Sequence, residues 1–97
     1  MYKIEDLGVT TAEQFNQMRE KVLNRNEAID RKIAELEELR EEKYKILEKD
    51  IGSIDKFIDL EAVDCAISGL QNSKIQMLEL LGQVREYVLS LGESEEQ

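Results

Sequence analysis

Residues 50–55 read Asp50-Ile51-Gly52-Ser53-Ile54-Asp55 and lie near the middle of the 97-residue chain. Gly52 can adopt the left-handed conformation that ends a helix, and the hydroxyl of Ser53 can cap the start of the next one. The stretch therefore predicts that one long helix ends here and a second begins, with the two folding against each other as an antiparallel hairpin.

The composition agrees with a helical fold. Charged residues make up 36% of the chain and aromatic residues 5%, and proline is absent. This bias is typical of long helices and coiled coils and unlike that of β-rich domains. A chain of this length forms one domain at most. We therefore expect a single all-α domain over residues 1–97, with coiled-coil-like packing of its two long helices.

The residues that start and end helices divide this domain into five segments. An apolar N-terminal arm is expected to fold back on the helices or to dock on a partner. The two helices are of nearly equal length, about 57 Å each at a rise of about 1.5 Å per residue, so a hairpin would match end to end. The expected segments are an arm (1–10), a first helix (11–50), a turn (51–53), a second helix (54–91) and an acidic, disordered tail (92–97).

The first helix begins at Thr10 or Thr11, since both head a capping-box pattern and the sequence does not decide between them. Its apolar residues follow an 11-residue repeat, which predicts a nearly straight helix. Arg25 and Arg40 fall on the same stripe. The predicted apolar members are Met18, Val22, Ile29, Ile33, Leu36, Tyr44, Leu47 and Ile51.

The second helix starts its apolar pattern with Ile54, Phe57 and Ile58 and then follows a heptad. Gly69 lies in a turn-like cluster, so we expect one helix that is kinked or weakened there, with a break into two helices as the close alternative. Lys74 is the single polar member of the heptad. The heptad residues are Leu60, Val63, Ile67, Leu70, Lys74, Met77, Leu81, Val84, Val88 and Leu91.

The second half of this helix carries more apolar residues than one neighbouring helix covers. Soluble monomers seldom expose large apolar patches, so we expect this region to contact a second copy of the chain, giving a four-helix dimer, or another protein. The predicted interface residues are Ile75, Leu78, Leu80, Val84, Tyr87, Val88, Leu89 and Leu91.

Charge narrows the range of partners. The formal net charge is -9, with 10 basic and 13 acidic side chains in residues 1–50 and 3 basic and 9 acidic in residues 51–97. Such a chain repels phosphate backbones and anionic lipid, so we expect neither a direct nucleic-acid partner nor a membrane partner, whereas a basic protein is a suitable one. The predicted acidic contact cluster just after the turn consists of Asp55, Asp59, Glu61 and Asp64.

Residues for catalysis are scarce. The chain has no histidine, the most common general base and zinc ligand near neutral pH. Cys65 has no second cysteine or histidine to activate it, and we expect it to be a small, partly buried side chain. Glycine loops for phosphate and Glu-x-x-His metal motifs are also missing. We expect no enzyme activity, no cofactor, no metal and no small-molecule substrate.

These observations favour a non-catalytic protein–protein interaction module that acts as a small assembly factor, adaptor or regulator. One alternative is an acidic inhibitor, of the kind viruses use against host machinery, that blocks a basic nucleic-acid-binding enzyme. A further alternative is a small chaperone or carrier for a secreted partner. A single cysteine and an acidic N-terminus without an apolar run predict a cytoplasmic location, in a cell or in an infected host.

Overall fold

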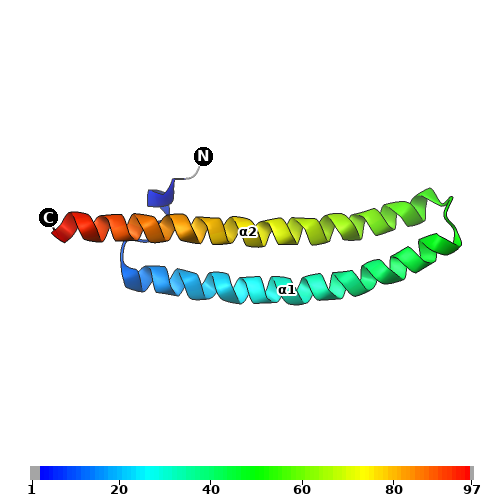
Figure 1. Cartoon of the computed structure of the whole chain (residues 1–97), viewed down its shortest axis with the longest axis horizontal. Helices are drawn as coiled ribbons and strands as arrows, with labels where there is room; N and C mark the ends of the chain where they lie inside the picture. The colour runs from blue at the N-terminus through cyan, green and yellow to red at the C-terminus, as the bar shows by residue number, and fades with distance from the viewer. Residues whose placement is uncertain (1–2, 97) are drawn as a thin grey trace. The chain divides into compact units, whose positions relative to one another are not determined.

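The computed structural model describes the backbone of residues 3–96 and the side chains of residues 3–92. Its elements are a short 3-10 helix η1 (Ile4–Leu7), a long helix α1 (Ala12–Lys49) and a long helix α2 (Ile54–Glu96). Residues 3–96 contain no strand. The two long helices pack against each other, which confirms the all-α helical hairpin (Figure 1).

The chain divides into two compact units, and both long helices contribute to each. The second unit, Glu27–Lys74, is the hairpin that contains the turn. The described part of the first unit consists of residues 3–26, with η1 and the start of α1, together with residues 75–96 of α2.

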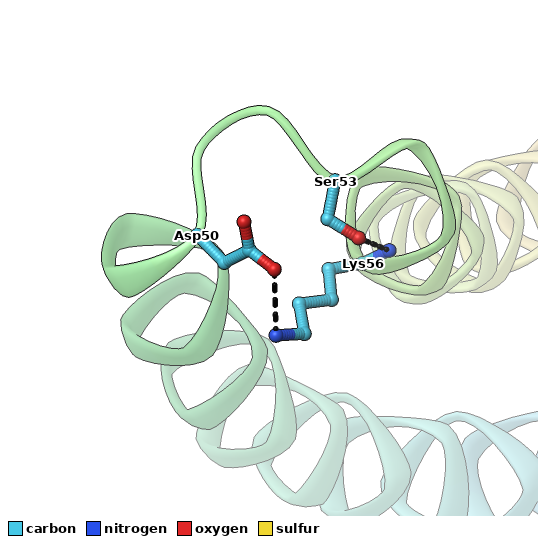
Figure 2. A network of polar contacts seen from close by, with 3 residues as sticks. All are labelled: Asp50, Ser53 and Lys56. Carbon is cyan, nitrogen blue, oxygen red and sulfur yellow. Dashed lines mark hydrogen bonds and ion pairs between the residues drawn. The ribbon is translucent and has the colours of Figure 1, made fainter.

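The turn is held by a backbone hydrogen bond and by two side-chain contacts, the latter shown in Figure 2. The Ser53 backbone N–H donates to the Asp50 carbonyl (3.0 Å), and the Ser53 Oγ accepts from the Lys56 backbone N–H (3.3 Å), so Ser53 caps α2 as predicted. The Lys56 Nζ also pairs with the Asp50 carboxylate (3.1 Å). Gly52 does not have the left-handed conformation expected of it: of the described residues only Gly8 has a positive φ, of 71°. The segment Asp50-Ile51-Gly52-Ser53 forms a hydrogen-bonded turn instead.

At its other end α1 begins with a capping box that Thr11 completes. The Thr11 Oγ1 accepts from the Gln14 backbone N–H (3.2 Å), and the Gln14 Oε1 accepts from the Thr11 N–H (3.2 Å). The same Oε1 accepts from the Thr10 N–H (2.9 Å). Thr11 is therefore the cap, and the backbone of Thr10 shares the same acceptor.

The inner face of α1 does not follow the predicted 11-residue repeat. From Val22 to Leu36 its buried and half-buried residues recur at alternating intervals of four and three, and Asn26 rather than Arg25 is buried. Tyr44 and Ile51, predicted on the stripe, are 56% and 78% exposed. The interval of four and three continues through Arg40 and Lys43 to the buried Leu47. The spacing of the inner-face residues could therefore not be recognised from the apolar residues alone, because several inner positions are polar. The residues of this α1 seam are Val22, Asn26, Ile29, Ile33, Leu36, Arg40, Lys43 and Leu47.

The inner face of α2 follows the predicted heptad throughout, because every one of the ten heptad positions is buried or half-buried. The helix is continuous through Gly69, so the alternative of two helices is wrong. It also continues through Gly92 to Glu96, so Gly92 does not terminate it and the residues up to Glu96 are helical rather than a disordered tail. Gln97 lies outside the described residues.

The core of the hairpin unit is a cluster of four buried aliphatic side chains, two from each helix: Ile29, Ile33, Val63 and Ile67. Leu36 and Leu70 pack against this cluster. Lys74, the polar member of the heptad, forms an ion pair with Asp30 of α1. Its aliphatic stem thus lies along the inner face while its ammonium group reaches the edge of the helix pair.

The N-terminal arm forms η1 and the link to α1. Gly8 ends η1 in the left-handed conformation that favours glycine. Ile4, Leu7 and Val9 are half-buried. A hollow of about 380 Å³ lies between the end of the arm and the first turns of α1, lined among others by Leu7, Val9 and Met18. The described arm therefore packs as part of the first unit. Met1 and Tyr2 lie outside the described residues.

Candidate functional site

A groove of about 760 Å³ lies on the hairpin unit, where the seam of α1 carries polar residues. Arg40 takes a seam position that an apolar side chain would otherwise fill, and the neighbouring Tyr44 is largely exposed. The half-buried Leu60 of α2 therefore borders an opening rather than a closed core. The residues that line this groove are Ala34, Glu37, Glu38, Arg40, Glu41, Tyr44, Leu60 and Asp64.

One ion pair connects the two helices at the groove. The Arg40 Nη1 lies 3.3 Å from the Asp64 Oδ1, and both side chains remain about half exposed. An exposed pair of this kind contributes about 0–1 kcal/mol to stability. It neutralises Asp64, so the negative charge of the groove comes from Glu37, Glu38 and Glu41 of α1.

The predicted acidic cluster is on the surface, and the structure divides it. Asp55, Asp59, Glu61 and Asp64 are all exposed on the first turns of α2. Asp64 faces the groove and pairs with Arg40. Asp55, Asp59 and Glu61 do not line the groove and form no ion pair with the described residues. The cluster is therefore not one continuous site.

A second surface, which the sequence did not predict, lies at the turn. Ile51 is 78% exposed and Ile54 is 75% exposed, and Phe57 and Ile58 are each more than half exposed. The register of the α2 heptad explains this exposure: Ser53 and Lys56 continue the inner face towards the turn, so Ile54, Phe57 and Ile58 stand off it. Extending the heptad back from Leu60 would have found this tip surface, defined as Ile51, Ile54, Phe57 and Ile58.

The predicted interface residues of α2 separate into three groups. Val84 is 0% exposed, so it belongs to the core of the chain itself and offers no contact to a partner. Four residues are half-buried: Leu80, Tyr87, Val88 and Leu91. Only Ile75, Leu78 and Leu89 are exposed. These three residues lie one or four positions after a heptad a position, on one side of the helix. They are called the C-terminal stripe below.

The metal-ligating and nucleophilic side chains of the described residues are scattered over the surface. Within them no three histidine, cysteine, aspartate or glutamate side chains lie close enough together to hold a metal ion. Cys65 is a free thiol and is exposed, not partly buried as expected. None of the described helices is long and apolar enough to cross a membrane. The surfaces that remain are the groove, the tip surface and the C-terminal stripe.

Comparisons with known proteins add no functional information, because no family model, curated protein or solved structure matches the chain.

Proposed function

We propose that this protein is a non-catalytic interaction module, an assembly factor, adaptor or regulator that binds other protein chains through the outer faces of its helical hairpin. The observation that carries the proposal is the set of large apolar side chains left exposed along α2. Ile54 is 75% exposed, and Ile75 and Leu89 are 54% and 55% exposed. Full burial of an exposed side chain of this size contributes about 1.5–3 kcal/mol, and burial of one that is already half covered contributes about half of that.

The C-terminal stripe is the surface proposed for self-association. Ile75, Leu78 and Leu89 share one side of α2, and a two-fold dimer brings the same stripe of each copy together. The stripe is narrower than the interface expected from the sequence, because Val84 and its half-buried neighbours contribute to the chain's own packing. A narrow apolar stripe favours a reversible dimer over an obligate one.

Sedimentation velocity over a range of protein concentrations tests this proposal. The wild-type chain is expected to pass from monomer to dimer, and Leu78→Ser/Leu89→Ser to remain monomeric. The control is Leu23→Ser/Leu39→Ser, which changes two leucines of α1 that are also exposed, at 38% and 37% against 47% and 55% for Leu78 and Leu89. The control is expected to dimerise as the wild type does. A wild type that stays monomeric, or a stripe variant that still dimerises, contradicts self-association through this stripe.

A further inference from the structure

The groove of the hairpin unit combines three properties that the tip surface and the C-terminal stripe lack: a concave shape, an apolar floor and a rim in which carboxylates outnumber the one cation. Its volume is about 760 Å³, which lies within the range of about 300–1,000 Å³ that is typical of ligand-binding pockets. In contrast, the C-terminal stripe is a row of exposed side chains on α2 alone, and the tip surface consists of exposed side chains on α2 together with Ile51 of the turn. The groove is also larger than the hollow beside the arm and, unlike that hollow, is lined by several carboxylates.

The apolar floor exists because the seam of α1 is polar at this level. Arg40 and Lys43 occupy the seam positions between Leu36 and Leu47, where an aliphatic pair would otherwise close the core, and the half-buried Leu60 lines the groove at this level. Tyr44, which is 56% exposed as a residue, lines the same groove. An aromatic ring beside a leucine is the kind of surface on which an apolar side chain of another chain packs.

The rim is acidic. Glu37, Glu38 and Glu41 line the groove from successive turns of α1. Glu41 has a distant ion pair with Lys45 (3.8 Å), whereas Glu37 and Glu38 have no ion pair with any described residue. Arg40, the one cation of the groove, is already paired with Asp64. A ligand in the groove would therefore meet unneutralised carboxylates beside apolar surface.

We propose that this groove binds a basic amphipathic helix of a partner protein. The inference rests on the proposed function and specifies the chemistry of one partner. Apolar side chains of the helix pack on Tyr44 and Leu60, and its lysines and arginines pair with Glu37, Glu38 and Glu41. Opposite charges across an interface accelerate association, and the carboxylates of the groove disfavour an acidic segment at this site.

The test uses the full-length protein and a synthetic amphipathic helix of alternating leucine and lysine blocks, labelled for fluorescence anisotropy. The wild type is expected to bind it, and Tyr44→Ala, which leaves the charge unchanged, to bind about tenfold more weakly. The groove triple variant Glu37→Gln/Glu38→Gln/Glu41→Gln is expected to lose about tenfold or more.

A matched triple variant separates a site from general electrostatic attraction. Glu13→Gln/Glu20→Gln/Glu86→Gln makes the same change in net charge at exposed positions away from the groove. It is expected to bind within about twofold of the wild type, because none of these three carboxylates lines the groove. Circular dichroism verifies that every variant remains helical.

Several results would overturn the proposal. They are a wild type that does not bind the peptide, equal losses in the two triple variants, and an unchanged affinity in Tyr44→Ala. A groove variant that alters sedimentation of the protein alone would assign the groove to a second copy of the chain, which also contradicts a basic partner. The peptide-binding results do not depend on the C-terminal stripe, and only the sedimentation result bears on self-association, so failure here and failure of self-association are distinguishable.

Discussion

Asn26 is a polar side chain on the otherwise apolar part of the α1 seam. It is only 7% exposed, and its Oδ1 has no hydrogen-bond partner in the described part of the chain. A buried polar atom without a partner costs about 1–3 kcal/mol of stability. In helix pairs a buried polar residue can specify the register of the two helices, although it lowers their stability.

We predict that Asn26→Leu raises the free energy of unfolding by about 1–2 kcal/mol, because it removes the unpaired oxygen and adds apolar volume. Urea unfolding followed by circular dichroism measures the change. Asn24→Leu, at an exposed position of the same helix, is the control and should change stability by no more than about 0.5 kcal/mol. A loss of stability in Asn26→Leu would mean that the buried amide has a partner after all.

At the scale of the elements, the two helices differ in how well their sequences predict them. The heptad of α2 identified its inner face because only Lys74 interrupts it, and Lys74 reaches Asp30 at the edge. The seam of α1 contains Asn26, Arg40 and Lys43, and two apolar residues lie off it at Tyr44 and Ile51. Hydrophobic periodicity cannot recognise a seam whose members are polar, so it selected the wrong period.

The groove and the tip surface were missed for the same reason. Both depend on where the inner faces run near the turn, and there the seam positions are filled by Arg40, Lys43, Ser53 and Lys56 rather than by apolar residues. Long cationic side chains can lie along a helix interface by their stems, which a hydrophobicity pattern does not register. The helix boundary at the turn was easier to predict, because the capping of α2 by Ser53 depends only on neighbouring residues.

Helix α2 carries glycine within its interior at a cost. An alanine Cβ at Gly69 would meet no atom within 4 Å. We therefore predict that Gly69→Ala stabilises the protein by about 1 kcal/mol through helix propensity alone. Thermal unfolding followed by circular dichroism measures the effect.

The comparison for this prediction is Gly52→Ala in the turn, where an added Cβ also meets no atom within 4 Å and φ is not positive. That variant is expected to gain less, about 0.4–1 kcal/mol at most, through the unfolded chain. Destabilisation by Gly69→Ala would indicate that another chain or a bend requires glycine there.

On the scale of the whole molecule, the exposed apolar residues contribute to surface properties rather than to folding. The tip surface holds four large apolar side chains, each more than half exposed. Their removal leaves no closed cavity, because each of these side chains is more than half exposed. Stability and surface hydrophobicity should therefore be separable in this protein.

We predict that Ile54→Ser/Ile58→Ser changes the free energy of unfolding by less than about 1 kcal/mol. The same variant should lower the fluorescence of an apolar dye bound to the native protein, because the tip surface becomes polar. Urea unfolding and dye titration measure the two quantities. A large loss of stability would show instead that these isoleucines are buried in the folded protein, within a dimer for example.

The polar seam near the turn also has a consequence for the order in which the hairpin forms. Its apolar cluster joins Ile33 to Val63, which are separated by about 30 residues of chain. The entropic cost of closing a loop rises by only about 0.6 kcal/mol for each doubling of the loop length. A folding nucleus next to the turn therefore has only a small entropic advantage over one at the cluster. With Lys43 and Lys56 beside the turn, we expect the hairpin to form first at the cluster and to close towards the turn afterwards. In the native protein the turn would then open without the cluster, and its amide hydrogens would exchange first. The most stable part of the hairpin is thus the aliphatic cluster, and the turn is its least stable part.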